Sequence, residues 1–350
     1  MSGVGPDEQP AFAKQPESPA SPESPESPES TGSPQVPKTH VIPVIAVVGP
    51  TATGKSALAI ALAHRLGGEI INADAMQLYR GMDIGTAKVP VSERGGIPHH
   101  QLDVLAVTEE ASVAAYQQGA RADRDVIIAR GAMPILVGGS GLYVRAALDR
   151  LEIPPTDPTV RAALEAELAA DGPEPLVARL AQADPVAASA IDPRNVRRVI
   201  RALEVIALTG RPFSATLPTR ELAHPAIILG LTADLVVLDA HIERRTRQMW
   251  ADGLLTEVTA LLEEGLAAGK TASTAIGYQQ AIAQLAGELT EDAAIDATSL
   301  ATRRLVRRQR SWFGPDPRIT WLPADSPDLV DRAIAVIADA GGLGAPSTRA

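Results

Sequence analysis

The chain has 350 residues, more than one hydrophobic core usually organises, so we expect two lobes or one domain with a sizeable insertion. Hydrophobic residues make up 45% of it, enough for a core, but no apolar run approaches the ~18 residues of a membrane span. The lack of cysteine excludes disulfides, thiolate zinc sites and cysteine nucleophiles, and the sequence shows no secretory signal. We therefore expect a cytoplasmic protein that does not contact a membrane.

The net charge of −10 is unevenly distributed. Residues 1–40 contain six acidic residues and two lysines, so they carry −4 of it. A negative sum argues against indiscriminate binding to nucleic acid, yet it permits a local basic surface, because the field near a site depends on where the charges lie. The positions of the arginines therefore matter more than the total.

Both ends of the chain lack the pattern of a folded core. Residues 1–40 are rich in Pro, Ser and Glu, with a Ser-Pro-Glu repeat over residues 21–29, and contain little to bury, so we expect a disordered tail. Residues 336–350 end in a Gly-rich stretch without apolar periodicity, which predicts a loose C-terminal tail.

Residues 41–150 alternate short apolar runs with longer amphipathic ones. This alternation predicts the first part of an α/β core with a parallel sheet. Strands are expected at residues 44–48, 69–73 and 135–137, and helices at residues 56–66 and 112–130.

The alternation stops at the proline-rich segment 153–158, and the residues that follow, to about 215, have a helical pattern without a strand. We therefore expect an inserted helical domain over residues 151–222. The core then continues over residues 223–335, with strands at 227–231 and 319–322 and helical runs at 241–264 and 293–312.

The segment between the first strand and the first helix matches the phosphate-binding motif G-x-x-x-x-G-K-[ST] at every fixed position. Its glycines let backbone amides wrap a phosphate, Lys55 supplies a positive charge, and Ser56 offers a hydroxyl to Mg²⁺. We therefore expect a P-loop NTPase-like core with bound Mg²⁺. The loop consists of Gly49, Pro50, Thr51, Ala52, Thr53, Gly54, Lys55 and Ser56.

Hydrolytic P-loop enzymes usually pair this loop with an apolar strand that ends in a metal-positioning aspartate. Here the run 135–137 leads into Gly138, Gly139 and Ser140, and residues 101–104 are too polar to replace it. This favours a phosphorylated or pyrophosphorylated substrate other than a hydrolysed nucleoside triphosphate.

Asp74 directly follows the second expected strand. We expect it at the carboxyl edge of the sheet, on a strand next to the one that leads into the phosphate loop. A carboxylate there can accept a proton or a hydrogen bond from an acceptor molecule lined up with the phosphate chain. The alternative is that Asp74 merely caps the following turn.

Four arginines in the expected insertion share one helix face. Asp192 and Pro193 suit the cap and first turn of this helix, and no acidic residue interrupts the face before Glu204. An anionic partner such as RNA explains the face better than solvation alone. Its members, at spacing i, i+3, i+4 and i+7, are Arg194, Arg197, Arg198 and Arg201.

A second basic run ends in Trp312 and Phe313, again without intervening acids. Arginine and aromatic side chains together are typical of surfaces that bind RNA. The run consists of Arg303, Arg304, Arg307, Arg308 and Arg310.

Several motifs occur together in one order. They are GPTATGKS at residues 49–56, NADAMQLY at 72–79, GMDIGTAK at 81–88 and VGGSGLY at 137–143, followed by shorter matches at 184–188, 201–205, 276–278 and 308–312. With these motifs the chain resembles the tRNA dimethylallyltransferases over roughly residues 44–322.

The resemblance implies transfer of a dimethylallyl group from dimethylallyl diphosphate to N6 of adenine 37, beside the anticodon of tRNAs, with release of diphosphate. The phosphate loop then holds the diphosphate with Mg²⁺ at Ser56, which accounts for the missing hydrolytic aspartate. The aspartate matching Asp74 contacts the alkylated amino group, Ser140 replaces a threonine of the family, and Arg245 matches an arginine that faces the diphosphate. We expect these last three residues to be catalytic.

The resemblance also implies which positions meet the tRNA anticodon stem-loop. We expect tRNA and dimethylallyl diphosphate as partners of a monomeric protein. The positions are Asp74, Ala75, Met76, Gln77, Leu78, Arg161, Arg197, Arg198, Arg201, Gly277, Tyr278, Arg307, Arg308 and Arg310.

Three other functions fit part of the sequence. A small-molecule P-loop kinase would use ATP at the loop and Asp74 as base, but it has no use for the arginine face. A non-catalytic RNA-binding module has no use for the phosphate loop. A free-adenine-nucleotide isopentenyltransferase shares the chemistry with AMP, ADP or ATP as acceptor, although the long basic insertion favours a folded RNA.

Overall fold

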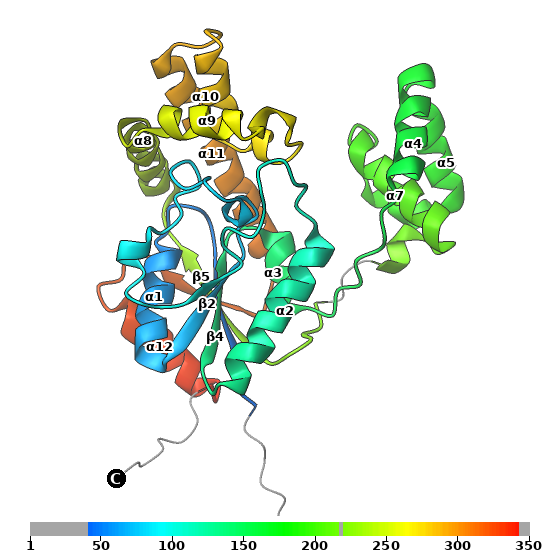
Figure 1. Cartoon of the computed structure of the whole chain (residues 1–350). Coiled ribbons are helices and arrows are strands. Elements are labelled where there is room, and N and C mark those ends of the chain that lie inside the picture. Colours follow the sequence, from blue (N-terminus) through cyan, green and yellow to red (C-terminus); the bar gives the residue numbers. More distant parts are fainter. Residues whose placement is uncertain (1–40, 217–219, 343–350) are drawn as a thin grey trace, which may run out of the picture. The chain divides into compact units, whose positions relative to one another are not determined.

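The computed structural model describes residues 41–216 and 220–342, so the expected N-terminal tail lies outside the described residues. Within the described part, six parallel strands form one sheet in the order β3-β2-β4-β1-β5-β6 (Figure 1). The strands are β1 (Val44–Val48), β2 (Gly68–Asn72), β3 (His99–His100), β4 (Met133–Gly138), β5 (Ala226–Thr232) and β6 (Ile319–Pro323). The central strands are continuous apolar runs because helices cover both faces of the sheet.

The strand order differs from the expectation at one point. β4 lies between β1 and β2, since Ile135 pairs with Ile45 on one side and with Ile70 on the other. The expectation that Asp74 follows a strand next to β1 is therefore wrong. The order depends on where each crossover returns to the sheet, not on which strand comes next in the chain. Asp74 still lies at the carboxyl edge, because all strands run parallel.

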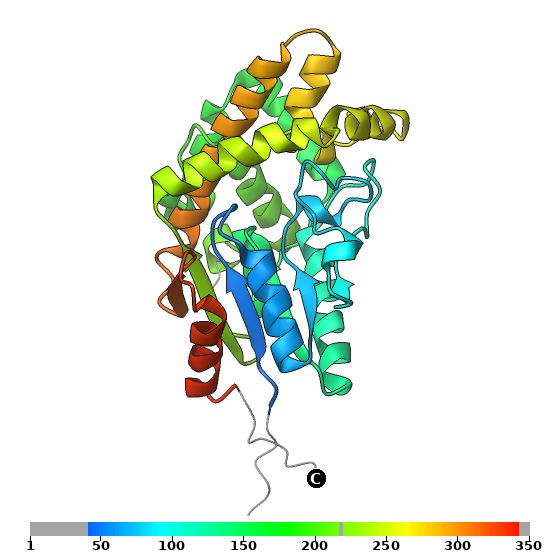
Figure 2. The ribbon, with the colours of Figure 1, turned by 90° about the vertical axis from the view of Figure 1, so that its left-hand side faces the viewer.

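Two pairs of helices cover the two faces of this sheet (Figures 1 and 2). On one face, Ile45 and Val47 pack with α1 (Lys55–Leu66) and α12 (Leu329–Asp339). Ala46 and Val48 point to the opposite face, where they pack with α2 (Val113–Ala129) and α3 (Gly141–Leu148). Helix α12 continues four residues past residue 335, where the core was expected to end. Its buried Ala333 and Ile337 are one turn apart and hold it on the sheet side.

The expected insertion forms a helical cluster with its own apolar core, which includes Leu180, Val199 and Leu203. Its last helix begins later than expected, because Asn195 is the N-cap and Asp192 instead bonds to the backbone and guanidinium of Arg194. The helices are α4 (Pro158–Asp171), α5 (Glu174–Ala183), α6 (Pro185–Ala190) and α7 (Val196–Thr209).

Between β5 and β6 the described chain forms four α-helices. The helical run expected over residues 241–264 is broken, because Gly253 adopts a left-handed φ of 98° that ends one helix and starts the next. No helix among the described residues is both long enough and apolar enough to cross a membrane. The four helices are α8 (Leu235–Ala251), α9 (Leu254–Glu263), α10 (Tyr278–Leu285) and α11 (Glu291–Phe313).

Candidate active site

The phosphate loop curls between β1 and α1. Gly49 has a φ of 136°, and a Cβ there would lie 2.6 Å from the carbonyl oxygen of Leu231. The Lys55 Nζ and the Thr53 hydroxyl both donate to the Pro50 carbonyl, at 2.6 and 2.8 Å. The loop therefore closes on itself at the start of α1, where backbone N–H groups and the helix dipole favour an anion.

Asp74 lies two residues beyond β2. Its Oδ1 accepts a hydrogen bond from the Met76 N–H at 3.0 Å, and its own N–H donates to the Asn72 Oδ1 at 2.9 Å. Asp74 therefore does cap the turn. Its Oδ2 has no hydrogen-bond partner among the described residues, so one carboxylate oxygen is available for a substrate.

Three charged groups meet at this edge of the sheet. Burial raises the pKa of Asp74, while the Met76 N–H and the charges of Lys55 and Arg245 oppose that rise. Burial lowers the pKa of Lys55 to about 8, with Asp74 opposing and Arg245 reinforcing the change, and burial also lowers the pKa of Arg245. Two desolvated cations beside one carboxylate favour an anionic ligand, and the raised pKa of Asp74 suits a proton acceptor.

Two later helices hold the phosphate loop at Thr51. From α8, the Arg245 Nη2 donates to the Thr51 hydroxyl at 3.3 Å. From α11, the Gln309 Oε1 accepts the Thr51 N–H at 2.8 Å, while its Nε2 donates to the Gly139 carbonyl at 3.0 Å. Ser140 follows, and its hydroxyl oxygen accepts the Ala75 N–H at 3.2 Å. The structure thus brings the expected catalytic residues together.

Gln309 is a site residue that was not expected from the sequence. It occupies one helical stripe with the buried Val306 and Phe313 and is itself only 7% exposed. A glutamine at an apolar position of a helix was the available signal.

The structure places three of the expected tRNA contacts inside the protein. Leu78, Gly277 and Tyr278 are buried, and the Tyr278 hydroxyl donates to the Glu257 Oε1 at 2.5 Å. Glu257 also accepts the Ile84 N–H at 2.8 Å. We therefore assign Gly277 and Tyr278 to the support of the loop over residues 81–88 and Leu78 to the apolar core beside the sheet, whereas Ala75, Met76 and Gln77 keep partial exposure.

The arginine face of the insertion splits into two parts. Arg197 and Arg198 are exposed, and neither side chain has an ion pair or hydrogen bond with another described residue. Arg201 instead donates to the carbonyls of Pro155 and Pro154 at 2.8 and 2.7 Å, and Arg161 contacts the buried Glu204 at 2.7 Å.

Two of the four arginines expected on this face, Arg201 and Arg194, have acidic partners in the structure. Although burial opposes it, hydrogen bonds from Arg161 and Arg201 lower the pKa of Glu204 and keep this carboxylate charged. Arg201 and Arg161 thus fix the connection into the insertion, while Arg194 is paired with Asp192 at 2.8 Å.

Helix α11 shows the same division. Arg304, Arg308 and Arg310 are exposed and have no ion pair within the described part of the chain, whereas Arg307 contacts Asp239 of α8 at 3.6 Å. Trp312, at the end of the run, is 46% exposed.

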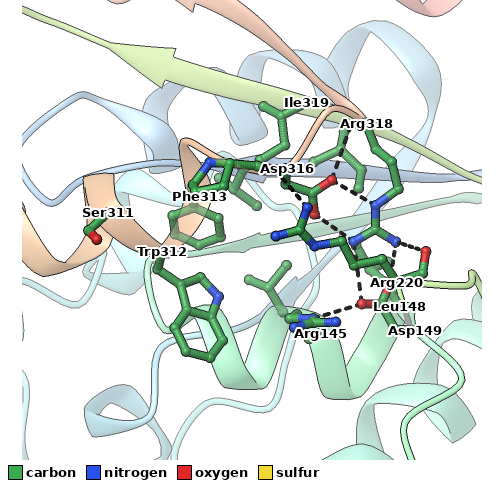
Figure 3. Close-up of a pocket in the computed structure, with 14 residues that line it drawn as sticks. Arg145, Leu148, Asp149, Arg220, Ser311, Trp312, Phe313, Asp316, Arg318 and Ile319 are labelled. Carbon is green, nitrogen blue, oxygen red and sulfur yellow. Dashed lines mark hydrogen bonds and ion pairs between the residues drawn. The ribbon is translucent and has the colours of Figure 1, made fainter. Parts of the chain in front are cut away.

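Trp312 also borders a cavity of about 220 Å³ between α3 and the end of α11 (Figure 3). Arg318 on its wall is paired with Asp149 and Asp316, at 2.5 and 2.6 Å. These charged groups are paired with one another, so we infer that this network stabilises the chain segments that lead to and from the insertion.

Comparison with known proteins agrees with this geometry. A family model described as IPP transferase matches residues 77–316, more than half of the chain. The chain belongs to the IPP transferase family. A second model, described as isopentenyl transferase, matches residues 42–108.

Relatives in this family cover nearly the same length. The tRNA dimethylallyltransferase of Salinispora arenicola is 60% identical over 294 residues, or 84% of this chain and 86% of the relative. The crystal structure of the tRNA isopentenylpyrophosphate transferase from Bacillus halodurans has a TM-score of 0.62 at 39% identity, covering 86% of this chain and 96% of that one. A crystal structure of a eukaryotic dimethylallyltransferase acting on tRNA has a TM-score of 0.75 at 28% identity, covering 87% and 81%.

Proposed function

We propose that this protein transfers the dimethylallyl group of dimethylallyl diphosphate to N6 of adenine 37, next to the anticodon of tRNAs, and releases diphosphate. The cluster of Lys55, Asp74 and Arg245 around the phosphate loop carries this proposal. The loop and the two cations suit a diphosphate leaving group, and the carboxylate suits an amine acceptor. Neither strand next to β1 supplies a metal-positioning aspartate, because β4 ends in glycine and Asp234 after β5 caps α8.

The proposed mechanism divides the work between the two sides of the site. As the allylic carbon–oxygen bond breaks, Lys55, Arg245 and the start of α1 stabilise the negative charge on the departing diphosphate. The adenine amine forms the new carbon–nitrogen bond and transfers its proton to the Oδ2 of Asp74. The Ser140 hydroxyl accepts the Ala75 N–H, so its own hydrogen is available to orient a substrate.

Ser56 fits a magnesium ligand. Its hard hydroxyl oxygen opens α1 beside Lys55 and has no hydrogen-bond partner among the described residues. A bound Mg²⁺ would neutralise diphosphate charge there.

We propose that the protein acts as a cytoplasmic monomer.

Mass spectrometry of tRNA nucleosides tests this function. After incubation of tRNA with purified protein, Mg²⁺ and dimethylallyl diphosphate, adenosine should gain one dimethylallyl group at position 37 and only there. Transfer to AMP, ADP or ATP in place of tRNA would instead identify a free-nucleotide isopentenyltransferase.

Alkaline pH should weaken the binding of dimethylallyl diphosphate. Lys55 loses its proton as the pH rises through its pKa of about 8, so an anion that needs the charged form binds less well above that pH. Calorimetry between about pH 7 and 9.5 should show the Kd rising by up to about tenfold per pH unit above 8. Lys55→Arg, whose guanidinium stays charged, should remove this rise. A Kd that depends on pH equally in both proteins would assign the titration to another group.

Reversing the charge of Arg197 and Arg198 should weaken tRNA binding, most strongly at low salt. Each lost phosphate contact should reduce the slope of log Kd against log salt by about 0.7–0.9. The matched control reverses the charge of Arg179 and Arg194. This variant changes the net charge by the same amount, but both arginines already have acidic partners. If both double variants alter the slope equally, the effect is one of overall charge, and the RNA contacts lie elsewhere, with residues 303–310 the next candidates.

A further inference from the structure

Helix α11 has two sides with different surroundings. Arg304, Arg308 and Arg310 are exposed, whereas Gln309 is turned into the protein, between turns that carry the buried Val306 and Phe313. The burial of a glutamine is costly unless both ends of its carboxamide find partners.

Both ends of the Gln309 carboxamide do find partners. Its oxygen accepts the Thr51 N–H at 2.8 Å, and its nitrogen donates to the Gly139 carbonyl at 3.0 Å. This orientation of the carboxamide is fixed. In the reverse orientation its NH₂ group would face the Thr51 N–H, donor against donor, and its oxygen would face the Gly139 carbonyl, acceptor against acceptor. A Cβ at Gly139 would lie 2.4 Å from the Gln309 nitrogen, so this approach requires glycine.

These two partners belong to opposite halves of the site. Thr51 lies in the phosphate loop, and its hydroxyl also accepts a hydrogen bond from the guanidinium of Arg245. Gly139 precedes Ser140, whose hydroxyl accepts the Ala75 N–H beside Asp74. We infer that Gln309 is a positioning residue that sets the distance and orientation between the bound diphosphate and the adenine amine. The inference rests on the roles proposed above for the phosphate loop and Asp74.

Each half of the site keeps its own contacts without Gln309. Lys55 and the start of α1 still face a diphosphate, and Asp74 is still held by Met76 and Asn72. Loss of the bridge should therefore affect the alignment of two bound substrates more than the affinity for either. A misplacement of about 1 Å between reacting groups can cost about 10²-fold in rate.

The test compares Gln309→Met with Gln248→Met. Methionine keeps the length and apolar packing of the side chain but makes neither hydrogen bond. Gln248 lies on the exposed side of α8, and among the described residues its side-chain amide hydrogen-bonds only to Asp252. The measurements are the single-turnover rate with both substrates saturating, the Kd of dimethylallyl diphosphate, the Kd of a tRNA anticodon stem-loop, and the Tm.

We expect Gln309→Met to lower the saturated rate by about 10²-fold, with each Kd within about threefold of the parent. Gln248→Met should match the parent in all four measurements. A saturated rate equal to that of the parent would overturn the inference. So would a loss of rate that is seen at low substrate concentrations and disappears when both substrates are saturating.

Gly139→Ala provides the second variant should Gln309→Met not fold. Its methyl group displaces the carboxamide while Gln309 stays intact, so the same loss of saturated rate with unchanged affinities is expected. A parent-like rate in this variant would also contradict the inference. Failure of the proposed function is separate, because the parent protein itself would then transfer no dimethylallyl group to tRNA.

Discussion

Replacing Lys55 with alanine should reduce dimethylallyl transfer by about 10³-fold or more, close to background. The Lys55 Nζ lies inside the curl of the phosphate loop, where it contacts the Pro50 carbonyl. It supplies positive charge where the breaking carbon–oxygen bond places negative charge on diphosphate. The other nearby cation, Arg245, donates to the Thr51 hydroxyl, so it does not replace the charge lost beside the Pro50 carbonyl.

This prediction is checked by following radiolabelled dimethylallyl groups into tRNA. Lys270→Ala is the matched control, because Lys270 is exposed and makes no hydrogen bond or ion pair with other described residues. Chelation of Mg²⁺ should lower the rate of the parent protein as well. Robust ATP hydrolysis, or ATP-dependent phosphorylation of a metabolite, by the parent protein would contradict the transferase function and favour a kinase.

Asp74→Asn should lower kcat by about 10²–10⁴-fold with a modest effect on tRNA affinity. Asparagine can still accept the Met76 N–H, so the turn after β2 should persist and the Tm should change little. What disappears is the basic oxygen that takes the proton of the adenine amine. The aromatic amine is a poor nucleophile, so the loss of this acceptor should act on the chemical step.

Asp234→Asn controls for the loss of a capping carboxylate. Asp234 also follows a parallel strand, and its Oδ1 accepts the N–H of Val236 at 2.7 Å. Unlike Asp74, it has an exposed side chain that caps α8. Parent-like kcat is expected for this variant. An unchanged kcat in Asp74→Asn would leave Asp74 with the role of a turn cap alone.

Much of the core was predictable from the sequence, because its signals are local. The phosphate loop needs glycine at positions such as Gly49, where φ is positive and no Cβ fits, and a strand and helix must flank it. Asp74 was expected at the carboxyl edge because it directly follows an apolar run. These features depend on neighbours in the chain, so the sequence by itself determined the loop, the edge and the basic helices.

Only the tertiary structure decided how these parts meet. The place of β4 between β1 and β2, the pairing of Arg201 with Glu204, and the burial of Tyr278 depend on packing between distant segments. Gln309 contacts residues 258 and 170 positions away in the chain. The helical period indicates that Gln309 is buried but does not name its partners, because whether an arginine faces solvent or a glutamine bridges two loops depends on the residues that the fold brings beside it.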